Sequence, residues 1–223
     1  MLWEQDVAGS NPVSPTIYGG AIAVIAQRWA GGSDLMPDRA RPFALFTAGP
    51  VGAGKSELTA VLLERYDLAS LDSDEITAFL AALKPERSFW ALRPLALRLL
   101  DRWQGALIAR GASLLVNTTA ADLVFVGSLQ DRLAAQGYAC AMIFVVADAA
   151  ECHARNAARS NPRPDHAVER TLAACSVSRP ALERMFVQFQ TVENRGGIAM
   201  FRERTRREIW SWLDRLPAPP PFP

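Results

Sequence analysis

The sequence is poor in the residues that commonly hold metal ions or form disulfide bridges. It has only two histidines, His153 and His166, which argues against a histidine-based zinc site. Its three cysteines, Cys140, Cys152 and Cys175, are odd in number and show no metal-ligand spacing. We therefore expect ordinary reduced thiols, as in a cytosolic protein, and no disulfide framework.

Long apolar segments and a strong net charge are also missing. No apolar run reaches the roughly 18 residues that a membrane-spanning helix needs. The stretch 18–30 is too short for that, contains Arg28 and has no charged segment before it, so we expect neither a membrane anchor nor a signal peptide. A formal net charge of +1 favours neither a nucleic-acid binder nor a membrane-surface protein, although it does not exclude a local basic cleft.

The chain does have enough apolar residues for a core and a regular alternation of elements. Half of its residues are hydrophobic and 21% are charged, as in one ordinary globular domain. From Phe43 onward, strand and helix patterns alternate, which predicts a three-layer αβα fold with a mainly parallel five-stranded sheet. We expect strands at 43–47, 68–71, 112–116, 141–147 and 186–192, and helices at 55–66, 75–83, 89–110, 122–136, 149–159, 166–175, 180–185 and 201–213.

The two ends of the chain differ from this pattern. Residues 1–40 hold many Gly, Pro, Ser and Asn breakers, so we expect either a flexible arm or an extension ahead of a natural start at Met36. The second idea comes from Gly9-Ser10-Asn11-Pro12, whose natural codons reproduce the T-arm sequence of many transfer-RNA genes. Residues 41–215 form the predicted domain, and the proline-rich residues 216–223 form a tail.

The most specific motif is Gly49-Pro50-Val51-Gly52-Ala53-Gly54-Lys55-Ser56, the phosphate loop, which matches G-x-x-x-x-G-K-[ST] at every fixed position. It lies between an apolar strand pattern and a helical pattern, as the motif requires. Glycines let backbone N–H groups approach phosphate oxygens, and the next helix adds the unpaired N–H groups of its first turn. We therefore predict a kinase-like P-loop NTPase domain that binds ATP, with Lys55 at the β- and γ-phosphates and Ser56 on Mg²⁺.

Asp72 and Asp74 follow the second predicted strand, at the sheet edge where the phosphate loop also lies. A carboxylate there can accept a proton from an attacking hydroxyl group or help to hold Mg²⁺ through water. Side chains alternate between the two faces of a strand, and Asp72 and Asp74 are two residues apart, so both could point to the same face. The alternative is that one or both cap the helix that begins near Glu75.

Asn117, Thr118 and Thr119 end the third predicted strand at the same edge. The third predicted strand ends in Leu114-Leu115-Val116-Asn117, so it lacks the Asp that follows the apolar run in a standard Walker B motif. An amide is a poor direct Mg²⁺ ligand compared with a carboxylate. We therefore expect these three side chains, together with Asp72, to bind the substrate, with a polar turn ahead of Asp122 as the alternative for the three.

Arginines follow the fourth predicted strand. Arg155 and Arg159 lie four residues apart on one helical face, and Arg163 follows in the helix-breaking stretch 160–164. This position favours a lid whose arginines neutralise charge on the transferred phosphoryl group. A solvated arginine face is the alternative.

One more polar motif, Asn194-Arg195-Gly196-Gly197, follows the last predicted strand. It is expected either to contact the nucleotide base or to form a plain turn, and the residues alone do not decide. Trp90, Leu97 and Trp103 have the spacing of residues that pack into a core, so no role in the site is predicted for them.

Together these motifs resemble the zeta-toxin family and the wider group of small P-loop kinases that includes polynucleotide kinases. The resemblance covers roughly residues 43–197. It implies that the second acidic residue of Asp72-Ser73-Asp74 is the catalytic base and that Arg155 and Arg163 are the family's lid arginines. It also implies that the late Asn-Arg-x-Gly motif, here Asn194 to Gly197, lies near the base of the nucleotide.

The chain departs from this family at Asn117-Thr118-Thr119. Zeta toxins that phosphorylate UDP-N-acetylglucosamine resemble Glu-Gly-Thr at this place. The missing glutamate puts a sugar-nucleotide acceptor in doubt and leaves the kinase chemistry intact. Nothing in the sequence indicates an antitoxin partner.

We therefore predict an ATP- and Mg²⁺-dependent phosphotransferase that acts on a hydroxyl group of a small molecule, for which a nucleotide sugar is one candidate. Its predicted catalytic residues are Lys55, Asp74, Arg155 and Arg163. One alternative is a polynucleotide or transfer-RNA-end kinase, which needs a basic groove leading to Asp74. The other is a nucleotide-dependent switch that hydrolyses ATP slowly and binds a partner through the helix at 201–213, which carries Trp210 and Trp212.

Overall fold

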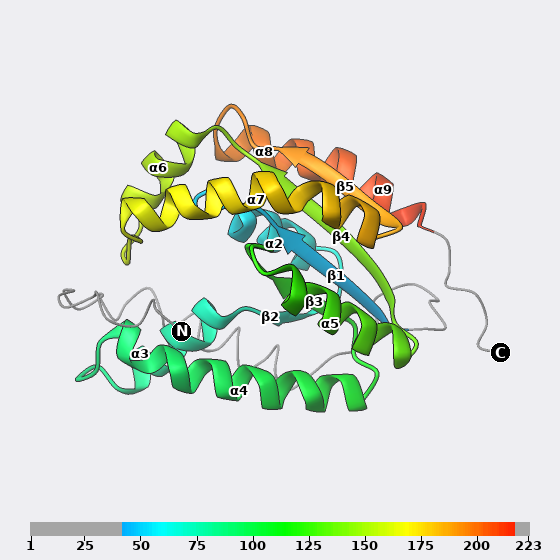
Figure 1. The fold of residues 1–223 in the computed structure, drawn as a ribbon, viewed down its shortest axis with the longest axis horizontal. Coiled ribbons are helices and arrows are strands. Elements are labelled where there is room, and N and C mark those ends of the chain that lie inside the picture. Colours follow the sequence, from blue (N-terminus) through cyan, green and yellow to red (C-terminus); the bar gives the residue numbers. More distant parts are fainter. Residues whose placement is uncertain (1–41, 217–223) are drawn as a thin grey trace.

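Five parallel strands form one sheet at the centre of the computed structural model, which describes residues 42–216 (Figure 1). The order across the sheet is β2-β3-β1-β4-β5, and every neighbouring pair is parallel. This confirms the predicted fold class. The expectations for residues 1–40 and for the tail 217–223 lie outside the described residues. The strands are β1 (Phe43–Ala48), β2 (Ala69–Leu71), β3 (Leu114–Asn117), β4 (Ala139–Val146) and β5 (Gln188–Glu193).

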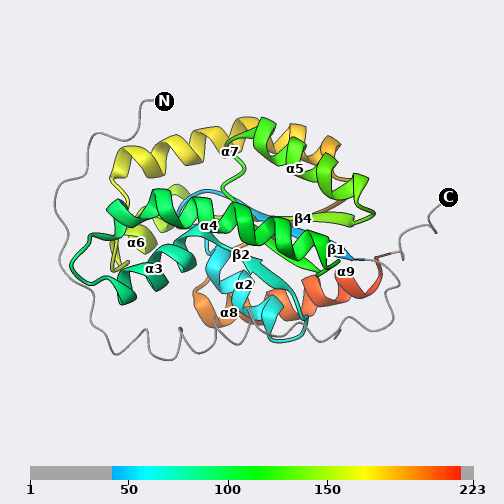
Figure 2. The ribbon, with the colours of Figure 1, turned by 90° about the horizontal axis from the view of Figure 1, so that it is seen from below.

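Helices cover both faces of this sheet, so its central strand β1 is buried along its whole length (Figure 2). Phe43 and Leu45 face the core on the side of α2, α8, η2 and α9, whereas Ala44 and Phe46 face the core on the side of α4, α5 and α7. No helix among residues 42–216 is long and apolar enough to span a membrane. The helices are α2 (Lys55–Leu63), α3 (Ser73–Leu83), α4 (Phe89–Ala109), α5 (Leu123–Ala135), α6 (Ala149–Ala157), α7 (Asp165–Met185), α8 (Ile198–Thr205), the π-helical segment η2 (Arg206–Trp210) and α9 (Ser211–Asp214).

The start of α3 differs from the prediction. The helix begins at Ser73, so Asp74 lies in its first turn and does not share a strand face with Asp72. Asp72 is the N-cap residue, and its carboxylate accepts a hydrogen bond of 2.7 Å from the backbone N–H of Asp74. Asp72 caps α3 instead of extending β2, because its side chain accepts a hydrogen bond from an N–H group that the first helical turn leaves without a partner.

A second difference lies in α7, which continues where two helices were expected at 166–175 and 180–185. Pro180 lies inside this helix and removes one backbone hydrogen bond, a change that costs about 3 kcal/mol in a helix interior. The helix continues because Val168, Cys175 and Leu182, each seven residues apart, are all buried in the two core clusters on either side of the sheet.

The carboxyl ends of the strands bring the predicted site residues to one edge of the sheet. β1 is the central strand, so the phosphate loop that follows it has neighbours on both sides. On one side lie the residues after β2 and at the end of β3, and on the other side lie α6 after β4 and Asn194 after β5.

Candidate active site

The phosphate loop joins β1 to α2 in a conformation that depends on its glycines. Gly49, Gly52 and Gly54 have φ angles of 141°, 81° and 100°, which side chains of other residues rarely adopt. A Cβ atom on Gly52 would lie 2.2 Å from the carbonyl oxygen of Cys152, and one on Gly49 would lie 2.5 Å from that of Val145. The glycines are therefore needed both for the turn and for the close packing of the loop on β4 and α6.

Lys55 is the first residue of α2, and its side chain folds back over the loop. Its Nζ atom donates hydrogen bonds to the carbonyl oxygens of Gly49 (2.7 Å) and Pro50 (2.8 Å). Burial is the main reason why the pKa of Lys55 is lowered to about 8, so the ammonium keeps most of its charge at neutral pH. Together with the N-terminus of α2, it makes this end of the site positive, as phosphate binding requires.

Asn194 supports the loop from the side of β5. Its amide, 3% exposed, donates a hydrogen bond of 2.7 Å to the carbonyl oxygen of Ala53. The Asn194 side-chain oxygen accepts a hydrogen bond of 3.3 Å from Arg155, which also donates one of 2.9 Å to Glu151. The predicted lid residue Arg155 is therefore directed toward Glu151 and Asn194 rather than into the cavity in front of the loop.

A cavity of about 250 Å³, the phosphate cavity, lies in front of the loop and of the ends of β2 and β3. It brings together residues that are far apart in the sequence, and most of them were predicted to belong to the site. Arg155, Asn194 and Arg195 do not line it. The lining includes Lys55, Ser56, Asp72, Asp74, Asn117, Thr118, Thr119, Arg159 and Arg163, and in addition Ser73 and Arg93.

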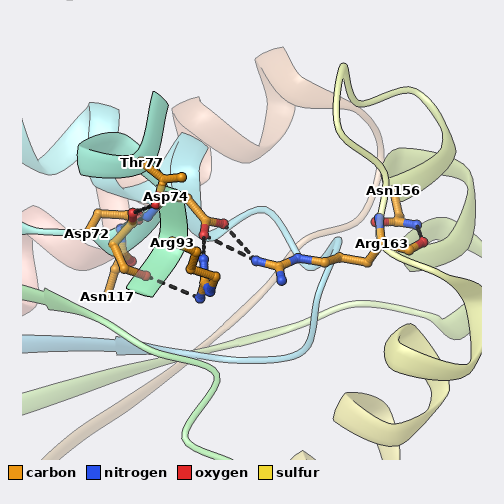
Figure 3. A network of polar contacts seen from close by, with 8 residues as sticks. Asp72, Asp74, Thr77, Arg93, Asn117, Asn156 and Arg163 are labelled. Atoms are coloured by element: carbon orange, nitrogen blue, oxygen red, sulfur yellow. Dashed lines mark hydrogen bonds and ion pairs between the residues drawn. The ribbon is translucent and has the colours of Figure 1, made fainter. Parts of the chain in front are cut away.

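Two arginines hold the carboxylate of Asp74 (Figure 3). Arg93 of α4 donates a hydrogen bond to one of its oxygens, and Arg163 lies 3.1 and 3.2 Å from its two oxygens. Burial tends to raise the pKa of Asp74, but Arg163 and Arg93 outweigh this effect and hold the pKa below its usual range. Asp74 is therefore an ionised carboxylate, fixed between α4 and the segment that follows α6.

Arg163 reaches Asp74 from the segment between α6 and α7, as Figure 3 shows. Asn156, which is 2% exposed, fixes its backbone with two hydrogen bonds, one donated to the Arg163 carbonyl oxygen (2.8 Å) and one accepted from its N–H (3.0 Å). The guanidinium carbon lies 4.2 Å from the ring centre of Trp90 on α4, close enough for a cation–π interaction. The position of Arg163 is thus set at both its backbone and its charged end.

Asp72 and Asn117 form a second polar group, at the ends of β2 and β3. The Asn117 amide nitrogen donates hydrogen bonds to Asp72 (2.8 Å) and to the hydroxyl of Thr59 (3.0 Å). The Asn117 amide oxygen accepts a hydrogen bond from the hydroxyl of the buried Thr47. Burial, followed by the negative charge of Asp74, raises the pKa of Asp72, although its hydrogen bonds act in the opposite direction.

Metal binding at this place depends on oxygen atoms. No group of three or more His, Cys, Asp or Glu side chains in the described part of the chain is arranged to hold a metal ion. The oxygen donors that line the phosphate cavity include the hydroxyl of Ser56 and the carboxylate of Asp72. This set fits Mg²⁺, which prefers oxygen ligands and is commonly held by one or two protein groups together with substrate phosphates.

Four residues of the site, Ser73, Trp90, Arg93 and Asn156, were not predicted from the sequence. Trp90 was assigned to the core, and Ser73, Arg93 and Asn156 were given no role. The spacing of Trp90 and Arg93 places both on one face of α4, which is the available signal for their shared position. Only the packing of α3 on α4 shows that this face is turned toward Asp74.

The remaining candidates lie away from the cavity. Arg195 is exposed and pairs with Glu193 at 3.4 Å. Trp210 and Trp212 are half-buried and pack against the core on the side of α2, with the guanidinium of Arg65 5.2 Å from a Trp210 ring centre.

A five-stranded parallel sheet with a phosphate loop after its central strand defines the fold as that of a kinase-like P-loop domain. The family model for zeta toxins matches residues 26–210 of the chain. The protein therefore belongs to the zeta toxin family. No curated protein matches the chain by sequence.

Solved structures share this fold at low sequence identity. A chain of the AvrRxo1-ORF1:-ORF2 complex with ATP matches with a TM-score of 0.64 and 15% identity, over 81% of this chain and 64% of that one. A chain from the PezAT chromosomal toxin–antitoxin system of Streptococcus pneumoniae matches with a TM-score of 0.57 and 12% identity, over 91% and 99%. A sugar kinase from Janibacter sp. HTCC2649 matches with a TM-score of 0.50 and 19% identity, over 81% and 99%. The protein spans less than two thirds of the AvrRxo1 chain that it matches.

Proposed function

We propose that the protein is an ATP- and Mg²⁺-dependent phosphotransferase that moves the γ-phosphoryl group of ATP to a hydroxyl group of a small molecule. The observation that carries this proposal is that Lys55 and Asp74 line one cavity, so a phosphate-binding loop and an ionised carboxylate face the same space. Membership of the zeta toxin family and the fold shared with an ATP-bound complex and a sugar kinase support it.

The phosphate side of the reaction follows from the loop and its surroundings. Backbone N–H groups of the loop bind the phosphates, and the ammonium of Lys55 exchanges its two loop carbonyls for β- and γ-phosphate oxygens. Arg159 and Arg163 line the same cavity and neutralise the charge on the moving phosphoryl group, a role that the family resemblance had given to Arg155 and Arg163. Mg²⁺, when bound at Ser56, supplies further neutralisation of the phosphate charge.

The acceptor side has a cavity of its own. The acceptor cavity, of about 420 Å³, adjoins the phosphate cavity and shares Asp74 and Arg163 with it, while Phe89 and Trp90 of α4 also line it. Its volume is in the range of small-molecule sites. The acceptor hydroxyl takes the place of one arginine contact of Asp74. Its oxygen then bonds to the γ-phosphorus, its proton passes to Asp74, and the bond from the γ-phosphorus to the β,γ-bridging oxygen breaks to release ADP.

Transfer of label from γ-labelled ATP tests this proposal. The full-length protein is incubated with labelled ATP, Mg²⁺ and an extract that contains both metabolites and RNA, and the Lys55→Ala variant serves as the blank. We expect a labelled small molecule in the wild-type reaction alone. Label on RNA ends would replace the proposal with the polynucleotide-kinase alternative, and label in inorganic phosphate alone would replace it with the ATPase switch.

A further inference from the structure

The first half of the phosphate loop is attached to α7 by a side chain. The backbone N–H of Val51 donates a hydrogen bond of 3.1 Å to the hydroxyl of Thr171, near the start of this helix. The Thr171 hydroxyl itself donates a hydrogen bond of 2.9 Å to the carbonyl oxygen of Val168. A hydroxyl has one proton and two lone pairs, so the bond to Val168 uses the proton and leaves the lone pairs for the loop. Thr171 is therefore an oriented acceptor for the Val51 N–H.

This contact separates the N–H groups of the loop by their use. Val51 lines the phosphate cavity, but its N–H is already bonded to Thr171. Lys55 and Ser56 begin α2, and the N–H groups of a first helical turn have no acceptor inside the helix. Those groups are the ones that a phosphate can bind. The hydrogen bond to Thr171 therefore holds the shape of the loop and leaves its phosphate-binding groups open.

The loop is attached at two points, one on each side of Gly52. Thr171 holds the N–H of Val51, and Asn194 donates a hydrogen bond of 2.7 Å to the carbonyl oxygen of Ala53. Gly52 has a φ angle of 81°, and a glycine can adopt many other backbone conformations. The peptide between Val51 and Gly52 is therefore not fixed by its own sequence, and the bond to Thr171 selects its orientation.

The helix α7 is itself fixed to both sides of the cavity. Val168 is 0% exposed, and the thiol of the buried Cys175 donates a hydrogen bond of 3.0 Å to the carbonyl oxygen of Thr119, which lines the phosphate cavity. Arg163, two residues before the helix, contacts Asp74. The hydroxyl that holds the loop thus belongs to the same helix that carries Arg163 to the carboxylate on the other side.

We propose that Thr171 is a positioning residue of the phosphate loop. It holds the Val51 peptide against α7, so that the N–H groups of Lys55 and Ser56 face the phosphates at a set distance from Arg163. Thr171 touches neither nucleotide nor acceptor and acts only through the loop. The proposal rests on the proposed function only in requiring that a nucleotide binds at the phosphate loop.

Calorimetry of ADP binding to the full-length protein with Mg²⁺ tests this proposal without any acceptor. Thr171→Val keeps the shape of the side chain and removes the hydroxyl, so ADP affinity should fall by about five- to tenfold, as for the loss of one hydrogen bond. Thr171→Ser keeps the hydroxyl and should stay within about twofold of the wild type. Ser176→Ala, at an exposed hydroxyl of the same helix, is the matched control and should not change the affinity.

Hydrogen exchange of the Val51 amide, followed by NMR without nucleotide, is the second measurement. We expect exchange of this amide to become faster in Thr171→Val and to stay as in the wild type in Thr171→Ser, while the amides of β1 exchange as before in both. A general loss of stability would instead speed up exchange in β1 as well. The measurement therefore separates a local positioning role from a merely structural one.

Unchanged ADP affinity in Thr171→Val would overturn the proposal. An equal loss in Thr171→Ser would also overturn it, because the hydroxyl would then not be responsible. Faster exchange in β1 to the same extent as at Val51 would assign Thr171 to general stability and overturn the proposal. If the wild type does not bind ADP, the proposed function is contradicted, whereas exchange at Val51 still decides whether Thr171 holds the loop.

Discussion

The two sides of the phosphate cavity are built in different ways. The phosphate loop is one continuous segment that lines the cavity with Gly52, Gly54 and Lys55, and its shape depends on glycines packed against β4 and α6. The other side, the clamp, consists of Asp74, Arg93 and Arg163 together with Trp90, which packs against Arg163. These residues come from α3, α4 and the segment after α6. The loop therefore depends on local sequence, whereas the clamp depends on side-chain contacts between separate elements. Substitutions in the loop should abolish the reaction, and substitutions in the clamp should weaken it by degrees.

The largest effect is expected for Lys55→Ala. Loss of the ammonium that faces the β- and γ-phosphates should lower the rate of label transfer by about 10³-fold or more, because one preorganised charged donor is removed from the transition state. Lys84 is the only other lysine of the chain and lies exposed at the end of α3, so Lys84→Ala is the matched control. Comparable losses in the two variants would show that Lys55 has no special role.

Asp74→Asn should come next. The variant loses the proton acceptor, so kcat should fall by about 10²- to 10³-fold while the affinity for ATP stays near that of the wild type. The readouts are single-turnover label transfer and calorimetry with ATP, with the exposed Asp101→Asn on α4 as the control. Near-normal turnover in Asp74→Asn would remove this residue from the role of base.

Replacement of Arg163 by lysine tests the geometry of the clamp rather than its charge. Lysine keeps the positive charge but cannot lie over Trp90 as a planar group or contact both oxygens of Asp74 in the same way. We expect kcat to fall by roughly 10- to 100-fold, as for the loss of one charged hydrogen bond. Arg195→Lys, at an exposed arginine that pairs with Glu193, should leave kcat unchanged. Equal activity of Arg163→Lys and the wild type would mean that charge alone suffices.

The smallest effect is expected at Trp90, which supports the guanidinium of Arg163 from one side. Trp90→Leu removes the aromatic face and should lower kcat by about two- to fivefold, in line with a cation–π contribution of about 0.5–1 kcal/mol at a partly exposed site. Trp90→Phe keeps an aromatic face and should retain most of the activity. If Trp90→Leu and Trp90→Phe lose activity equally, the aromatic face does not matter and Trp90 does not act through a cation–π contact with Arg163.

Sequence patterns predicted the fold and the phosphate side of the site well, for physical reasons that differ between elements. The alternation of apolar strands and amphipathic helices predicted the parallel sheet, because strands buried on both faces have nearly continuous apolar runs. The phosphate loop was recognisable because its function depends on glycines and one lysine at fixed spacing in a single segment. Its packing against Asn194 and Cys152 was not predictable, since these contacts join segments that are far apart in the chain.

The clamp was only partly predictable. Asp74 and Arg163 were chosen because they follow strands at the right edge, but nothing in the pattern showed that Arg93 and Trp90 would join them. Neither residue stood out in the sequence, because a tryptophan on a long helix commonly packs into the core and an arginine commonly lies on the solvent-exposed face. The start of α3 was predicted two residues late. Asp72 is compatible both with an extension of β2 and with the N-cap of α3, and only the folded structure shows that it is the N-cap.

The central claim is that the phosphate loop and Asp74 serve one reacting phosphoryl group. A crystal structure of the protein with Mg²⁺ and a non-hydrolysable ATP analogue tests it most directly. We expect the γ-phosphate within hydrogen-bond distance of the Lys55 ammonium and on the side of the phosphate cavity that faces Asp74. A polyphosphate bound elsewhere, or a γ-phosphate that points away from Asp74, would contradict the account.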